Sequence, residues 1–167
     1  MANLFNIFGF QVSWWCCVLG TQNGFPLLGP LVMLLFILIH FKYVAYSFDE
    51  FKIILIGSGL GILVDGLYKF SGLIFYMGDS FNLLPPLWII AMWAGFCSTI
   101  SHSLRWLDNN YILSFLMGFI FGPLSYLAGY NFGVISMVLD YKTMLILSFS
   151  WGLCIPLLFF VNTKLVN

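Results

Sequence analysis

The sequence predicts an all-α membrane protein, a bundle of six transmembrane helices. Hydrophobic residues make up 62% of the chain and charged residues only 7%, whereas a soluble domain carries about 25% charged residues. Six apolar segments are each near the length of about 20 residues that crosses a hydrocarbon core about 30 Å thick. Together with short turns they occupy the 167 residues. We therefore expect one integral membrane domain over residues 1–167.

The predicted spans follow one another in chain order, each bounded by a polar turn. The first, 4–20, lacks the basic start and the small-residue cleavage site of a signal peptide, so we expect it to remain as a helix. The second, 26–47, starts at a proline, which costs little in the first turn of a helix, and the third, 52–77, follows an acidic turn. The fourth, 85–107, starts at two prolines, the fifth, 111–130, follows an Asp-Asn-Asn turn, and the sixth is 143–161.

The basic residues predict the orientation of the bundle. Four of the six fall on the side that holds both termini: Lys42, Lys52, Arg105 and Lys164. Lys and Arg in short loops favour the cytoplasm, so we expect both termini to be cytoplasmic. The net charge is zero and no basic run is present, so we expect membrane lipids and no nucleic acid among the partners.

Small residues recur at helical spacing and predict close helix packing. Three glycine pairs lie four residues apart: Gly57 with Gly61, Gly118 with Gly122, and Gly129 with Gly133. Such pairs let helix backbones approach closely in lipid, either within the bundle or between copies. The four cysteines fall inside predicted helices without a Cys/His spacing suited to zinc, so we interpret them as core residues and expect no metal and no cofactor.

Asp65 is the first functional candidate, because it lies near the middle of the third span. An ionisable side chain at that depth is costly and is usually tied to transport, proton movement or ligand binding. Lys69 follows one helical turn later and is a further candidate ligand-binding residue. An internal ion pair between the two residues is therefore the structural alternative.

Further polar and aromatic side chains lie at neighbouring depths. Gln11 on the first span and His102 on the fourth could contact a ligand or hydrogen-bond to a neighbouring helix. Arg105 could hold an anionic headgroup, or extend its side chain to the lipid phosphates. His40, at the end of the second span, is expected to anchor that end at the interface. Three aromatic residues could form the apolar walls of a pocket: Trp14, Trp93 and Tyr126.

Several segments resemble one bacterial family, domain of unknown function 2878. They are residues 6–18, Gly29-Pro30, Asp65, and the segments 86–93, 102–106 and 122–129. The resemblance implies a small polytopic inner-membrane protein of a Gram-negative bacterium. It also implies a lipid-linked role, since genes of this family often lie beside genes for lipid-modifying enzymes, but it supplies no activity.

These observations give one functional hypothesis and two alternatives. The hypothesis is a protein that binds or moves a small amphipathic or lipid-like molecule in an intramembrane pocket centred on Asp65. The first alternative is a membrane-embedded enzyme, or enzyme subunit, that modifies lipids, with Asp65 or His102 as acid or base. The second is a scaffold or assembly subunit with a membrane-protein partner or a second copy of itself. The size and span count are similar to the substrate-binding components of energy-coupling-factor transporters, which belong to this second alternative.

Overall fold

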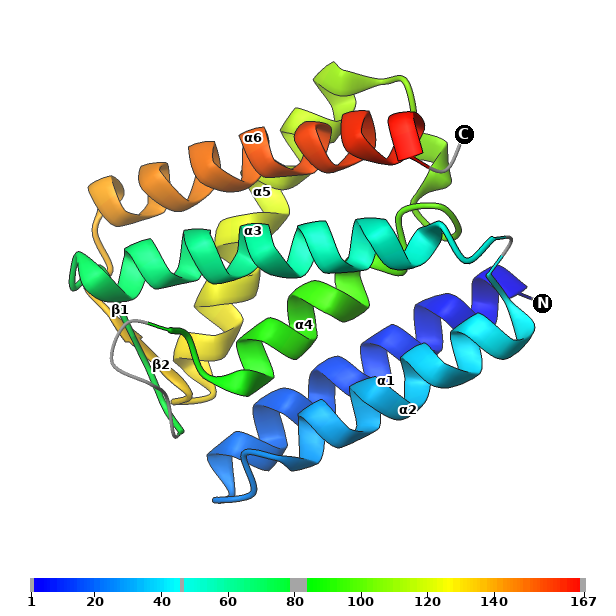
Figure 1. Cartoon of the computed structure of the whole chain (residues 1–167). Helices are drawn as coiled ribbons and strands as arrows, with labels where there is room; N and C mark the ends of the chain where they lie inside the picture. The colour runs from blue at the N-terminus through cyan, green and yellow to red at the C-terminus, as the bar shows by residue number, and fades with distance from the viewer. Residues whose placement is uncertain (1, 46, 79–83, 166–167) are drawn as a thin grey trace.

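The computed structural model describes residues 2–45, 47–78 and 84–165, and it is mostly helical. Six helices run back and forth between two ends of the molecule (Figure 1). They are α1 (Ala2–Gln22), α2 (Leu28–Tyr43), α3 (Glu50–Phe70), α4 (Leu87–Cys97), α5 (Tyr111–Asn131) and α6 (Tyr141–Leu165). The described ends of the chain, and the turns after α2 and α4, lie at one end of the bundle, which we call the terminal end. The other turns lie at the opposite end, which we call the strand end.

Four of these helices are long and apolar enough to cross a membrane: α1, α3, α5 and α6. The other two are apolar but shorter than predicted. α2 has 16 residues and α4 has 11, which correspond to about 24 and 16 Å. The prediction of six continuous helical spans was therefore too simple.

The fourth predicted span, 85–107, is helical over its first half only. After Cys97 the chain forms successive turns and a single 3-10 turn, η1 (Arg105–Leu107). Hydroxyl groups close these turns, since Ser98 Oγ donates to the Gly95 carbonyl (2.7 Å) and Thr99 Oγ1 to that of Phe96 (2.6 Å). Irregular backbone is tolerated at membrane depth where it is buried in protein, and Ser98 and Thr99 are buried. The predicted span ran through this segment although it contains three serines, a threonine, a histidine and an arginine.

The strand end also departs from the all-α prediction. The third helix stops at Phe70 instead of continuing to residue 77, and Gly72, at φ 71°, allows the chain to reverse. Two short strands follow α3 and α5, β1 (Ile74–Tyr76) and β2 (Ile135–Met137), and they pair antiparallel with Phe75 opposite Ser136. This pairing joins the end of α3 to the end of α5.

The predicted glycine pairs are confirmed as contact points between helices for two of the three cases. A side chain at Gly57 would overlap Cys97, and one at Gly61 would overlap the indole of Trp93, both on α4. Gly118 and Gly122 face Trp151 of α6 in the same way. In the third pair, Gly129 packs against β2, whereas Gly133 has no described neighbour within 4 Å and instead has φ 74°. It ends α5 in a left-handed conformation, the usual role of a glycine after a helix.

Apolar side chains cover the outside of the helices. On α2 the leucines at 31, 34, 35 and 38 are between 54 and 63% exposed, and α5 and α6 expose similar faces. An apolar surface of this kind suits contact with lipid.

Candidate functional site

Asp65 is completely buried and accepts three hydrogen bonds. The hydroxyls of Tyr76 and Tyr126 donate to Oδ1 (2.6 and 2.7 Å), and the indole N–H of Trp93 donates to Oδ2 (2.7 Å). The donors come from β1, α5 and α4, so one carboxyl group joins four segments. A buried carboxyl is retained at low cost only when its oxygens are hydrogen-bonded.

The alternative of an ion pair between Asp65 and Lys69 is wrong. Lys69 instead extends toward the exterior and donates to the carbonyl of Leu84 (3.0 Å). One helical turn places the two residues on the same face of α3, but the interior donors occupy both carboxyl oxygens.

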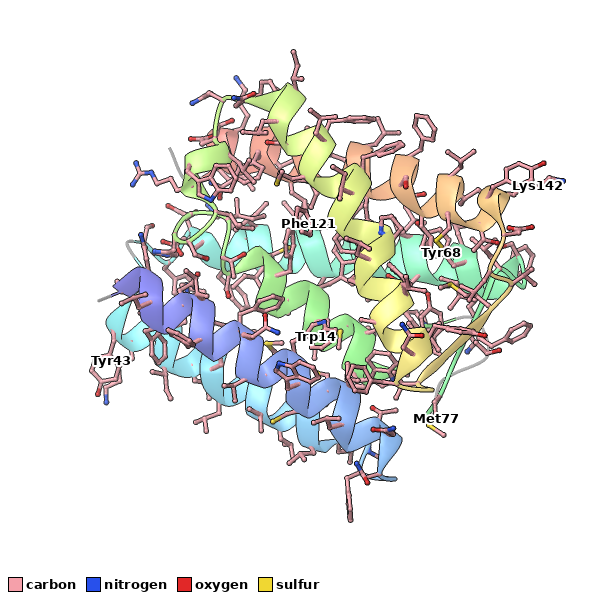
Figure 2. All side chains as sticks on the ribbon, turned by 180° about the vertical axis from the view of Figure 1, so that it is seen from behind. Trp14, Tyr43, Tyr68, Met77, Phe121 and Lys142 are labelled. Carbon is pink, nitrogen blue, oxygen red and sulfur yellow. The ribbon has the colours of Figure 1, made fainter. Side chains whose placement is uncertain are left out.

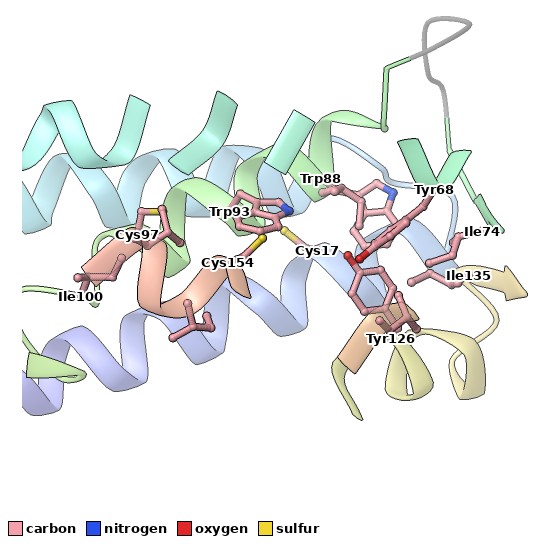
Figure 3. Close-up of a cluster of buried hydrophobic side chains, with 14 of the residues drawn as sticks. Cys17, Tyr68, Ile74, Trp88, Trp93, Cys97, Ile100, Tyr126, Ile135 and Cys154 are labelled. Carbon is pink, nitrogen blue, oxygen red and sulfur yellow. The ribbon is translucent and has the colours of Figure 1, made fainter. Parts of the chain in front are cut away.

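Local packing fixes the three donors. Gly61 leaves room for the Trp93 indole against α3, and this indole stacks on Trp151 with ring centroids 4.6 Å apart. Tyr68 and Tyr126 meet edge to face, with centroids 5.9 Å apart, close to Ile74 and Ile135 of the two strands (Figure 3). The β1–β2 pairing holds Tyr76 within reach of Asp65.

An apolar pocket of about 670 Å³ lies on the other side of Trp93 and Tyr126. Side chains from α1, α4, α5 and α6, with the segment 104–107 and Ile135, line it. Five of the six tryptophans of the chain belong to this lining: Trp14, Trp88, Trp93, Trp106 and Trp151. Its size is within the usual range for sites that bind small molecules, about 300–1,000 Å³.

The pocket is open toward the outer surface between α1 and α5. Figure 2 shows α4 behind these two helices, with Trp14 and Phe121 labelled near the gap. Gln11 on α1 and Phe121, Leu124 and Ser125 on α5 are both pocket-lining and exposed. Because these helices carry apolar outer faces, the opening would meet lipid rather than water if the helices span a membrane.

The structure brings some of the predicted site residues together and separates others. Gln11, Trp14, Trp93 and Tyr126 line the pocket, and their contact with a ligand stays a prediction. Asp65 lies behind the wall, where it holds Trp93 and Tyr126 without lining the pocket itself.

The remaining three predicted residues, Lys69, His102 and Arg105, are not among the lining residues. Trp88 also lines the pocket; it is buried, and its indole donates to the Met77 carbonyl (2.9 Å).

Sequence reasoning missed a second buried polar cluster, which lies at the terminal end. The expectation that His40 anchors a helix end at the interface was wrong, because His40 is completely buried. Its Nε2 lies 3.3 Å from Oε2 of Glu50, and Nε2 of His102 lies 2.8 Å from the same oxygen. The sequence held one signal for this cluster, because the chain has only two histidines and one glutamate, and all three belong to it.

Four candidate membrane-spanning helices, an apolar pocket and buried polar clusters define this chain as a helical membrane protein of the multi-pass class. Its family follows from sequence: residues 3–157 match the model of a family described as protein of unknown function, DUF2878, and the chain belongs to that family. The resemblance stated above is thereby confirmed. No curated protein and no solved structure matches the chain.

Proposed function

We propose that this protein crosses a bacterial inner membrane six times, with both termini in the cytoplasm, and binds or moves a small amphipathic or lipid-like molecule. The observation that carries the proposal is the pocket of about 670 Å³, walled by tryptophans and open between α1 and α5. A hydrocarbon chain fits such a lining, because nearly every group that it would touch is apolar or aromatic.

The position of the opening favours a ligand that enters from the bilayer. The apolar outer faces of α1 and α5 border it, as Val12 and Ile120 are 56 and 48% exposed. A molecule with an acyl or isoprenoid chain already partitions into that environment, so it can enter sideways without crossing water. The few polar groups at the mouth, Gln11 and Ser125, would lie beside its headgroup or its first polar bond.

In this proposal Asp65 positions the pocket wall. Its carboxyl fixes the hydroxyl of Tyr126 and the indole of Trp93, and both side chains also face the pocket. A preformed wall reduces the ordering cost of ligand binding. The role of Asp65 is therefore to hold the shape of the site, which differs from the direct ligand contact expected from sequence.

Native mass spectrometry of the protein released from nanodiscs tests the proposal. We expect a discrete small molecule or lipid bound to the wild type and lost from Ser125→Trp, which places a large side chain in the mouth of the pocket. Ile120→Trp introduces the same side chain at an exposed position on the same helix outside the pocket. This matched control should retain the ligand.

Four outcomes would contradict the proposal. Nonspecific bulk phospholipid in all three proteins would exclude a specific ligand, and a co-purifying membrane protein in its place would favour a scaffold subunit. Turnover of a lipid by the purified protein would favour a lipid-modifying enzyme. Retention of the ligand by Ser125→Trp would place it outside this pocket.

A further inference from the structure

Three metal-ligating side chains converge inside the terminal end of the bundle. His40 comes from the last turn of α2, Glu50 from the first residue of α3, and His102 from the turns that follow α4. Their exposures are 0, 2 and 3%. One ligand atom of each lies within 4.8 Å of the others.

The geometry of these atoms is close to that of a coordination sphere. Tetrahedral bonds of about 2.0–2.1 Å from nitrogen and oxygen to Zn²⁺ place neighbouring ligand atoms about 3.4 Å apart. Nε2 of His40 lies 3.3 Å from Oε2 of Glu50, and Nε2 of His102 lies 2.8 Å from it. A shift of about 0.5 Å at His102 would bring its distance from Glu50 to the tetrahedral value. The three ligand atoms lie within 4.8 Å of one another, and metal binding would also bring the two imidazole nitrogens to about 3.4 Å.

We propose that His40, Glu50 and His102 form a binding site for a divalent transition-metal ion, with Zn²⁺ as the best fit. Two imidazoles and one carboxylate are a ligand set that such ions take in proteins, whereas Mg²⁺ and Ca²⁺ prefer oxygen ligands. The site is separate from the apolar pocket, so it stands independently of the proposed lipid-like ligand.

Asn6 of α1 provides a neighbouring polar group that metal binding would engage. Its Nδ2 donates to the Ser98 carbonyl (3.1 Å) and lies 3.4 Å from Nδ1 of His40, and its Oδ1 accepts from Ser103 Oγ (2.6 Å). A metal on Nε2 leaves the proton of a neutral imidazole on Nδ1. Rotation of the Asn6 amide would then present Oδ1 to that proton and let the Ser103 hydroxyl accept from Nδ2, at the cost of the hydrogen bond from Nδ2 to the Ser98 carbonyl.

The metal would link segments that are far apart in sequence. It joins α2, α3 and the irregular segment after α4, while Asn6 attaches α1 to the same point. Leu104, Trp106 and Leu107, just beyond His102, line one end of the apolar pocket. The ion would therefore fix the part of the fold where helical hydrogen bonding is interrupted.

Metal analysis of the purified protein tests this site. The protein carries an affinity tag without histidines, and its metal content is measured by inductively coupled plasma mass spectrometry. We expect about one ion per chain in the wild type and roughly a tenfold or greater loss in Glu50→Gln and His102→Gln. Asp65→Asn, which alters the other buried carboxyl, should retain the metal.

A second measurement keeps the site testable if the ligand variants fail to fold. Wild type stripped with a chelator is titrated with Co²⁺ and Zn²⁺, and we expect Co²⁺ absorption bands of a four-coordinate nitrogen and oxygen site and a higher melting temperature with either ion. The proposal is overturned if the wild type retains no metal and neither ion changes its spectrum or melting temperature. Equal metal content in wild type and in folded Glu50→Gln would overturn it as well.

Discussion

The Asp65 carboxyl is the central polar contact of the strand end. It gathers three donors that would otherwise be buried next to apolar side chains. Each donor left without an acceptor costs about 1–3 kcal/mol. The position thus controls how α3, α4, α5 and β1 fit together.

Two substitutions of Asp65 should distinguish how much its side-chain volume and its hydrogen bonds each contribute to stability. Asp65→Ala removes the acceptor of three buried donors and should lower the free energy of unfolding by about 3 kcal/mol or more. Asp65→Asn should cost less, because its oxygen can accept from Trp93 while its amide donates to the tyrosine hydroxyls. The free energy of unfolding of both variants is measured in mixed micelles with increasing dodecyl sulfate. Equal stability of the alanine variant and wild type would contradict this account.

The stacked pair Trp93 and Trp151 offers a matched comparison. The indole N–H of Trp93 donates to Asp65 (2.7 Å), whereas that of Trp151 is buried without an acceptor among the described residues. Both changes to phenylalanine remove a similar ring area, so Trp93→Phe should be more destabilising than Trp151→Phe by about 1–3 kcal/mol. The same micelle unfolding assay checks the difference, and the reverse order would show that ring packing outweighs the hydrogen bond.

At the level of the helices, small residues determine how closely neighbours approach. α3 carries Gly57, Gly59 and Gly61 within two turns, and the first and third face α4. The sequence predicted close packing at this spacing, and the contacts of Gly57 and Gly61 confirm it. Which helix would lie against them depended on the rotation of α3, which spacing does not give.

Alanine substitution of two neighbouring glycines tests this packing. Gly61→Ala would force the Trp93 indole away from α3 and should cost about 1–3 kcal/mol. Gly59→Ala is the control, because no described neighbouring heavy atom lies within 4 Å of its added methyl, and the change removes a glycine penalty of about 1 kcal/mol in a helix. A thermal unfolding scan in detergent should show a lower melting temperature for Gly61→Ala and an unchanged or higher one for Gly59→Ala.

The irregular segment after α4 shows the limit of hydropathy for assigning helices. Residues 98–107 include three serines, a threonine, a histidine and an arginine, yet the prediction extended the fourth span through them. The hydroxyls of Ser98 and Thr99 donate to carbonyls three positions earlier, whereas Ser101 donates to Asn162 (3.1 Å), 61 positions away in the sequence. The polar composition was a local signal that the helix ends at Cys97, but the distant partner could not be predicted from it.

For the molecule as a whole, the distribution of basic residues gives a test of orientation. Lys42, Lys52, Arg105 and Lys164 lie toward the terminal end, and Lys69 and Lys142 toward the strand end. We expect the terminal end to be cytoplasmic, since basic residues are retained on that side of the membrane.

Fusions to reporter enzymes measure this orientation. Alkaline phosphatase, which is active only outside the cytoplasm, should be active when fused after residue 24 or 139 and inactive after residue 47 or 109. A green fluorescent protein joined to the C-terminus should fluoresce. The opposite pattern would show that the terminal end lies outside the cytoplasm. Phosphatase activity at two consecutive fusion sites, one at each end of the bundle, would contradict six crossings.

The sequence by itself determined the class of protein, the approximate positions of the six apolar segments and the isolation of Asp65 within one of them. It could do so because hydropathy adds up along the chain and an isolated acidic residue stands out against it. Only the tertiary structure decided that Asp65 binds Trp93, Tyr76 and Tyr126, and that His40 meets Glu50 and His102. Such meetings depend on the rotation and tilt of each helix, which packing against distant segments sets. The same packing decided that a pocket lies beside the buried carboxyl and not around it.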